Sequence, residues 1–203
     1  MRRAIDLRVL ELLAARLCHD LIGPVTAIAN GIELMADDDG EFGRDALTLV
    51  ADSSRQGGRR LQFYRFAWGF GGGGLTGAAP HALAADFFSD AAIDCDYGAA
   101  VRELPPAEQK LACAMLAVAG EGLPRGGRMM LSLVAGGLQI DAVGAGGGLS
   151  PEAVAALALS ASPAALTTRT VAAYVAGLLA EARGRRLVVE ALAGGFRVLA
   201  APL

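Results

Sequence analysis

The stretch from Leu10 to Met35 constrains the fold most, because its apolar side chains recur at the spacing of an amphipathic helix. At about 100° per residue, His19 falls on the side of this helix opposite the apolar stripe. We therefore expect a long helix over about residues 5–35, with His19 facing solvent. The stripe expected to form the packed seam steps by three or four residues and consists of Leu7, Leu10, Leu17, Leu21, Ile28 and Ile32.

A second helical pattern follows over about residues 42–68, after the turn-forming run Asp37 to Gly40. Two long helices joined by a short loop predict an antiparallel hairpin. The hairpin alone cannot cover both apolar stripes. Either the C-terminal region covers them, or a second copy does so in a dimeric four-helix bundle, and we favour the homodimer. The seam predicted for the second helix consists of Leu47, Val50, Ser54, Gly57, Leu61 and Tyr64.

Four consecutive glycines at 71–74 predict a linker between a helical domain, 1–70, and a second domain, 75–203. In the second domain the predicted elements alternate in the order helix, strand, helix, strand, strand, helix, helix, strand, strand. This order is typical of an α/β sandwich with one mixed sheet, which makes the whole chain α+β. The predicted spans are 75–90, 92–97, 107–121, 128–134, 138–143, 152–159, 168–183, 187–191 and 196–200.

The composition excludes several classes of function. The chain of 203 residues has a formal net charge of −3, so we expect it to bind neither nucleic acid nor an anionic membrane. No apolar run reaches membrane-spanning length without a charge or a proline. A secretory signal peptide is not expected, because charges interrupt the first apolar stretch at Asp6, Arg8 and Glu11. Reduced thiols, and hence a cytoplasmic protein, are predicted by three widely spaced cysteines, Cys18, Cys95 and Cys113.

The motif His19-Asp20-Leu21-x-x-Pro24 carries the chemistry of the first domain. A single histidine on an exposed helix face is often only a surface residue, and a proline often only kinks a helix. Neutral imidazole is nevertheless a nucleophile, and a carboxylate such as Asp20 can fix its tautomer by accepting the proton of the non-attacking nitrogen. The motif resembles the H-box of sensor histidine kinases. That resemblance implies a phosphoacceptor role for His19, an orienting and activating role for Asp20, and a helix-shaping role for Pro24.

The second domain resembles the ATP-binding domain of histidine kinases at Leu123–Gly127, at Gly144-x-Gly146, and at LLAEARG over Leu178–Gly184. The functional residues of that domain are replaced here. The asparagines for magnesium and phosphate fall at Ala114 and Val118, and the aspartate that reads adenine falls at Ala142. Apolar side chains can neither ligate Mg²⁺ nor accept a hydrogen bond from adenine. We expect no cofactor and no metal to be bound by this chain.

A phosphoacceptor hairpin followed by a degenerate ATPase-like domain resembles the dimeric bacterial histidine phosphotransferases of the ChpT type. The resemblance implies a carrier that takes a phosphoryl group from the receiver domain of a hybrid histidine kinase and passes it to response regulators. It also implies that Mg²⁺ is supplied by the partner receiver domain. Receiver docking is expected around His19, at Arg16, Ile22, Gly23, Thr26, Ala27 and Asn30.

Within that surface Ile22 has two interpretations, a docking residue or part of a second packed seam. Gly23 stands where bifunctional kinases place a side chain that orients water, so phosphatase activity is not expected. Two other functions stay open at this point. One is an active histidine kinase with a divergent ATP site, and the other is a non-catalytic dimeric signalling adaptor in which His19 is merely exposed.

Overall fold

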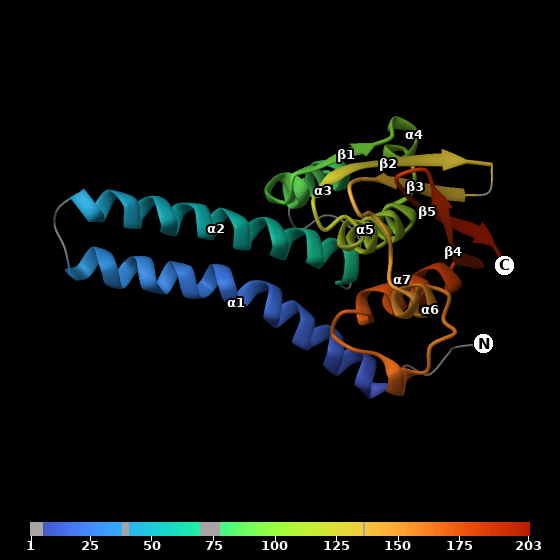
Figure 1. Ribbon diagram of the computed structural model, residues 1–203, viewed down its shortest axis with the longest axis horizontal. Helices are drawn as coiled ribbons and strands as arrows, with labels where there is room; N and C mark the ends of the chain where they lie inside the picture. The colour runs from blue at the N-terminus through green and yellow to red at the C-terminus, as the bar shows by residue number, and fades with distance from the viewer. Residues whose placement is uncertain (1–5, 38–40, 70–77, 136) are drawn as a thin grey trace.

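The computed structural model describes residues 6–37, 41–69, 78–135 and 137–203. Two long helices, α1 (Leu7–Asp37) and α2 (Glu41–Trp68), lie side by side and project from an α/β part, as Figure 1 shows. The predicted pair of helices is confirmed, although residue 5 and the glycine run 71–74 lie outside the described residues.

The seam between the two helices differs from the prediction. Leu7, Leu10 and Ile32 are 66%, 52% and 52% exposed, so much of the predicted α1 stripe is not packed within this chain. Small residues form the contact instead. A Cβ on Gly31 would stand 2.5 Å from Val50 Cγ2. Side chains of this size let the two backbones approach closely, which turns the large leucines outward. On α1 the buried positions are Val9, Pro24 and Gly31.

On α2 the predicted seam is confirmed in part, because Val50 lies against Gly31 and Gly57 lies against Pro24. Leu47 and Leu61, predicted in the seam, are 58% and 56% exposed, and Ser54 is exposed as well. The buried side chains include Ala46 and Ser53, each one position before a predicted seam residue. Near the end of α2 a cluster of apolar side chains joins the core of the α/β part instead of α1 alone: Phe63, Tyr64, Phe66 and Ala67.

The α/β part contains one mixed five-stranded sheet in the order β1-β2-β3-β5-β4. Strand β1 pairs parallel with β2, and the other neighbours pair antiparallel. The predicted order of helices and strands is confirmed. Within the described ranges, the structure adds three short helices that were not predicted, η1, α4 and η2. The elements are α3 (Pro80–Phe88), η1 (Ser89–Ala91), β1 (Ile93–Tyr97), α4 (Ala99–Arg102), α5 (Pro106–Glu121), β2 (Gly127–Val134), β3 (Gly137–Val143), α6 (Pro151–Leu157), η2 (Pro163–Ala165), α7 (Val171–Glu181), β4 (Arg185–Leu192) and β5 (Gly195–Pro202).

Helix α7 begins later than the predicted residue 168. Thr170 Oγ1 accepts a hydrogen bond from the main-chain N–H of Thr167 at 3.0 Å, which closes a turn before the helix. Side chains of this type compete with helical hydrogen bonds and favour such turns. The loop between α6 and α7 is thereby held beside α1, where Arg8 Nη2 donates to the Leu166 carbonyl at 3.2 Å.

Aromatic packing and ion pairs attach the hairpin to the α/β part. The rings of Phe63 and Phe87 stack with centroids 4.1 Å apart. Arg59 donates to Asp90 Oδ1 at 3.0 Å and to Ser89 Oγ at 2.9 Å. The residues Leu7–Ala36 of α1 are, by length and composition alone, apolar enough to cross a membrane. In this structure that helix instead packs along α2 (Figure 1).

Candidate functional site

His19 lies in the middle of α1 with its side chain 82% exposed. Its Nδ1 lies 3.3 Å from Asp20 Oδ1, which is within hydrogen-bonding distance. When Nδ1 carries the proton and donates it to Asp20, Nε2 keeps a free lone pair. The arrangement can therefore present Nε2 as a nucleophile to a group arriving from solvent.

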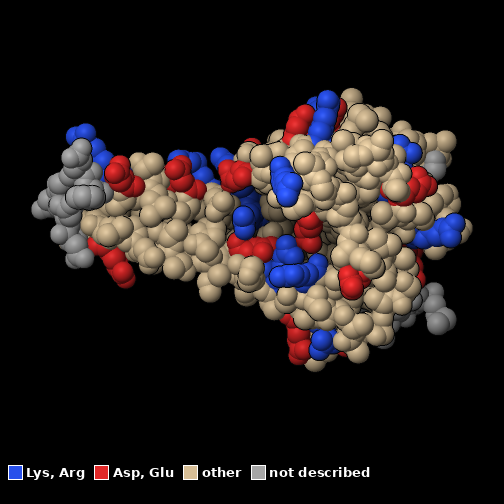
Figure 2. Space-filling view, viewed as in Figure 1, with Lys and Arg blue, Asp and Glu red and all other residues tan. Residues whose placement is uncertain are grey.

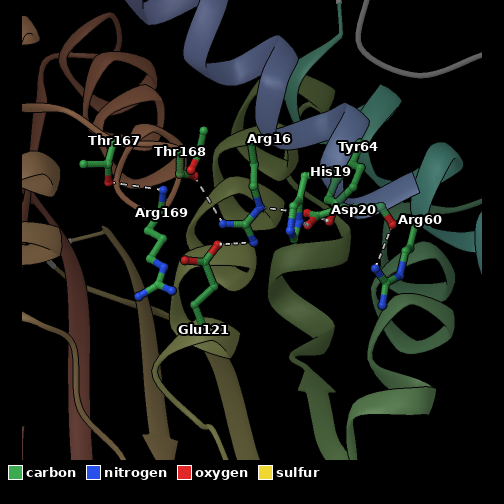
Figure 3. A network of polar contacts seen from close by, with 9 residues as sticks. All are labelled: Arg16, His19, Asp20, Arg60, Tyr64, Glu121, Thr167, Thr168 and Arg169. Carbon is green, nitrogen blue, oxygen red and sulfur yellow. Dashed lines mark hydrogen bonds and ion pairs between the residues drawn. The ribbon is translucent and has the colours of Figure 1, made fainter. Parts of the chain in front are cut away.

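Asp20 is held through the carboxylate oxygen that does not face His19. Its side chain is only 11% exposed, and Oδ2 accepts hydrogen bonds from Arg16 Nε at 2.8 Å and from the Tyr64 hydroxyl at 2.7 Å (Figure 3). Burial opposes ionisation, but the bonds from Arg16 and Tyr64 outweigh it and hold the pKa of Asp20 below its ordinary value. Asp20 is therefore a carboxylate at neutral pH, with Oδ1 left for His19.

Pro24 does not end α1, which continues to Asp37. Because proline has no N–H, the carbonyl of Asp20 lacks its usual helical donor four residues later. Arg60 of α2 donates to this carbonyl through Nη1 at 2.9 Å. The Pro24 ring is buried against α2, where a Cβ on Gly57 would stand 3.4 Å from Pro24 Cβ.

Arg16, which was predicted to meet a partner, forms several contacts within the chain. Beside its bond to Asp20, Arg16 Nη2 pairs with Glu121 Oε1 at 3.0 Å and Nη1 donates to the Thr168 carbonyl at 3.4 Å. Its side chain is only 20% exposed, so little of the guanidinium is available to another protein. Arg16 thus joins α1 to the end of α5 and to the loop before α7, as Figure 3 shows.

The other residues predicted to meet a partner lie on the surface around His19. Ile22 is 64% exposed, so within this chain it is not part of a second packed seam. A Cβ on Gly23 would meet nothing within 4 Å. Thr26 and Asn30 are exposed and Ala27 is half-buried. Together they form a mixed, open surface along α1 next to the imidazole.

A cavity of about 350 Å³ opens behind Asp20, where the hairpin meets the α/β part. Its walls include Arg16, Asp20, Arg60, Tyr64 and Glu121. Figure 2 shows basic and acidic side chains gathered around the hollow at this junction. Burial raises the pKa of Glu121, and the charge of Asp20 adds to that effect while Arg16 opposes it.

The positions that correspond to the nucleotide residues of histidine kinases are packed inside the α/β part. Ala114 and Val118 on α5 and Ala142 on β3 are 0%, 2% and 0% exposed. The neighbouring Asp141 is bound by Arg197 through two hydrogen bonds of 2.6 and 2.9 Å. Across the described parts of the chain, no three His, Cys, Asp or Glu side chains are grouped closely enough to hold a metal ion. These residues do not fit ATP and Mg²⁺.

Sequence reasoning missed three residues of this site: Arg60, Tyr64 and Glu121. The available signal is the spacing of Arg60 and Tyr64, which are four residues apart and therefore lie on one face of a helix. Glu121 ends α5, and nothing in the local sequence relates it to Arg16.

Residues 78–194 match the family model described as the histidine phosphotransferase C-terminal domain. The protein phosphotransferase ChpT of Brucella abortus (strain 2308) is 37% identical over 134 residues, which cover 64% of this chain and 62% of that protein, less than two thirds of its length. A solved structure described as a bacterial phosphotransferase superposes with a TM-score of 0.76 at 26% identity and covers 97% of both chains.

Proposed function

Because this chain belongs to the histidine phosphotransferase family and is of the ChpT type, we propose that His19 is its phosphoacceptor in a bacterial phosphorelay. His19 accepts a phosphoryl group from the receiver domain of a hybrid histidine kinase and passes it to the aspartates of response regulators. The observation that carries the proposal is an imidazole that is 82% exposed while its Nδ1 lies 3.3 Å from a well-held carboxylate.

The transfer follows from this geometry. The lone pair of His19 Nε2 forms a bond to phosphorus, and the phosphorus–oxygen bond to the donor's aspartyl carboxylate breaks with its electron pair leaving on that carboxylate. The proton stays on Nδ1, where Asp20 balances the positive charge of the phosphorylated ring. The second transfer reverses these steps onto the next receiver. Mg²⁺ in the receiver's own site would neutralise the phosphoryl oxygens.

We propose that the chain neither binds ATP nor phosphorylates itself. The proposal is supported by the apolar, buried side chains at Ala114, Val118 and Ala142. Introducing a polar side chain at any of them would place it in the core, not in a solvent-facing site. We propose that the α/β part supports the hairpin through contacts such as that between Glu121 and Arg16. We propose the same division as in the sequence, with 1–70 as the phosphotransfer unit and 75–203 as the degenerate ATPase-like unit.

Receiver domains are proposed to dock on the surface formed by Ile22, Gly23, Thr26, Ala27 and Asn30. This surface adjoins His19 and offers one large exposed apolar side chain, Ile22, among small and polar ones. Such a surface suits a modest interface with an apolar centre, which partners can leave quickly.

We also propose that the hairpin pairs with a second copy in a four-helix bundle. Val25 and Ile32, seven residues apart on α1, are 61% and 52% exposed, and Leu47 and Leu61 on α2 are exposed to a similar degree. Residues spaced by seven fall on one helix face. An apolar hollow of about 200 Å³ that includes Leu61 adjoins this surface. A homodimer would cover these side chains, and we expect the dimer to work in the cytoplasm.

The experiment that tests the function is transfer of labelled phosphate. The purified chain is incubated with labelled ATP alone and then with a labelled, phosphorylated receiver domain, in wild-type and His19→Ala forms. We expect label to arrive only from the receiver and only when His19 is present. Label arriving from ATP alone would show a working kinase site.

A second control uses the other histidine. His81 is the only further histidine in the chain, so His81→Ala is the matched variant and should accept label normally. If folded wild-type protein takes no label from several receivers, the phosphotransfer proposal fails and the adaptor is favoured.

A further inference from the structure

The main-chain carbonyl of Asp20 lacks its helical hydrogen bond, and a side chain of α2 supplies another donor. Pro24 removes the N–H that the Asp20 carbonyl would accept in an unbroken helix. Arg60 Nη1, 2.9 Å away, supplies the missing donor. An unsatisfied carbonyl in the middle of a helix costs free energy and bends the chain. Arg60 therefore fixes the helix at the residue that follows His19.

The side chain of Asp20 is also fixed from α2. The Tyr64 hydroxyl and Arg16 Nε both donate to Oδ2, at 2.7 and 2.8 Å. Only Oδ1 then faces His19 Nδ1, at 3.3 Å. A carboxylate anchored through one oxygen cannot rotate freely, so the direction of the other oxygen is defined as well.

These two contacts come from one face of α2. Arg60 and Tyr64 are four residues apart, about one helical turn, and both reach the same residue of α1. Within the described residues, neither of them forms a hydrogen bond or an ion pair with His19, whose partner is Asp20. Their influence on the imidazole must pass through Asp20.

On the premise of the proposed function, we propose that Arg60 and Tyr64 are positioning residues for the phosphoacceptor. Arg60 holds the main chain of Asp20 and Tyr64 holds its side chain, so that Oδ1 keeps the proton of His19 on Nδ1. The consequence is that Nε2 faces the incoming phosphoryl group without a proton. A neutral imidazole in water favours the proton on Nε2, which blocks that nitrogen as a nucleophile.

Tyr64→Phe tests the side-chain contact because it removes one hydroxyl and little volume. The matched control is Tyr97→Phe, since Tyr97 is also buried and its hydroxyl donates to Gln109 at 3.4 Å, within the α/β part. Ring nitrogen signals are recorded by ¹⁵N NMR of the full chain in a His81→Gln background, which leaves only His19 visible. We expect Tyr64→Phe, but not Tyr97→Phe, to shift the proton from Nδ1 towards Nε2.

The rate of transfer gives a second readout. We expect Tyr64→Phe to slow transfer from a phosphorylated receiver by about tenfold while the dissociation constant of the unphosphorylated receiver stays unchanged. A variant that merely loosened the fold would lower the melting temperature and weaken docking as well.

Arg60→Gln tests the main-chain contact, with Arg59→Gln as its neighbour control because Arg59 binds Ser89 and Asp90 instead. We expect Arg60→Gln to slow transfer about fivefold in the wild-type background. In a Pro24→Ala background, where an N–H again reaches the Asp20 carbonyl, the same change should slow it less than twofold.

The two proposals fail in different ways. If no receiver labels His19 but Tyr64→Phe still moves the proton, the positioning holds and the phosphorelay function fails. If the wild type takes label but neither Tyr64→Phe nor Arg60→Gln alters the tautomer or the rate, the positioning proposal is overturned. An equal shift in Tyr97→Phe would also overturn it, because the effect would then not depend on Asp20.

Discussion

The middle of α1 and the middle of α5 differ in the side chains that they carry, which are polar and hydrogen-bonded on α1 and apolar and buried on α5. On α1, Asp20 lies next to an exposed His19, and both its carboxylate and its carbonyl have donors from the neighbouring helix. On α5, the corresponding stretch of the α/β part carries Ala114 and Val118, both buried. On α1 the shielded polar groups of Asp20 have partners beside an exposed imidazole, whereas the middle of α5 carries apolar side chains that only pack.

The end of α5 shows what the α/β part still contributes. Glu121, its last residue, pairs with Arg16, which in turn binds Asp20. A helix that has no polar side chain at the nucleotide positions thus provides a carboxylate three contacts away from His19, through Arg16 and Asp20. The end of α5 therefore takes part in the arrangement around His19, although the middle of the same helix offers only apolar side chains.

Asp20→Asn should have the largest effect, because it weakens the acceptor for the proton on His19 Nδ1. We expect the rate of transfer to His19 to fall at least about 100-fold, while the chain stays folded. The matched control is Asp52→Asn on α2, whose carboxylate is exposed and pairs only locally with Arg55. The measurement is initial rate from a phosphorylated receiver. A loss of less than threefold would show that Asp20 is dispensable.

Leu61→Glu tests whether the exposed apolar face of the hairpin is an interface. A charge at a buried, symmetric contact appears twice in a dimer, so we expect the dimer dissociation constant to rise about 100-fold. Leu133→Glu on β2, where the leucine is 44% exposed, is the control and should leave association unchanged. Sedimentation or light scattering over a concentration series measures both. Equal masses for wild type and Leu61→Glu at every concentration would contradict the bundle.

Val118→Asn tests the packed middle of α5, because it places an amide, as in the resembling kinases, at a position that is 2% exposed here. Burying an amide without partners should lower the free energy of unfolding by about 2 kcal/mol and create no ATP binding. Val143→Asn, at a position 45% exposed, is the surface control, with an expected change within about 0.5 kcal/mol. Urea unfolding and ATP titration test this. ATP binding by Val118→Asn would show that one residue separates this fold from a working site.

Much of the fold follows from the sequence, because periodicity, glycines and prolines place most helices and strands. The seam of the hairpin does not. Helix α2 carries large apolar residues such as Leu47 and Leu61 and, one position before some of its predicted seam residues, small ones such as Ala46 and Ser53. Both sets repeat at helical spacing, and only the packed structure shows that the small residues meet within the chain and leave Leu47 outside.

The site divides in the same way between local and distant residues. His19, Asp20 and Pro24 lie close together in the sequence, so a short motif can predict them. Tyr64 and Arg60 are separated from Asp20 by 44 and 40 residues, so the pairing of the two helices must be known first. The contacts of Arg16 with Glu121 and Thr168 also depend on the packed structure, because the sequence places this arginine only next to the imidazole, where it suggests a partner contact.

Asp20 and Glu121 both pair with Arg16, but their pKa values are shifted in opposite directions. We therefore expect their contributions to stability to change with pH in opposite directions, and this is the smallest effect expected. The pKa of Asp20 is lowered in the folded chain, since bonds from Arg16 and Tyr64 outweigh burial. Its stabilising contribution is therefore complete above about pH 5 and is lost as the pH falls below the ordinary value near 4. The pKa of Glu121 is raised by burial, with a further increase from Asp20. Its contribution is present below its ordinary value and is lost as the pH rises through the raised one.

Urea midpoints of wild type, Asp20→Asn and Glu121→Gln between pH 3 and pH 7 separate these contributions. Asp20→Asn should lose less stability than wild type as the pH falls from 5 to 3, because it has no carboxylate to protonate. Glu121→Gln should lose less stability than wild type as the pH rises from 4 to 7, because its neutral amide never becomes a buried charge. If Glu121→Gln instead weakened the protein increasingly with rising pH, the ion pair with Arg16 would outweigh burial. Glu121 would then stabilise the site as a charge and not merely as a hydrogen-bonding group.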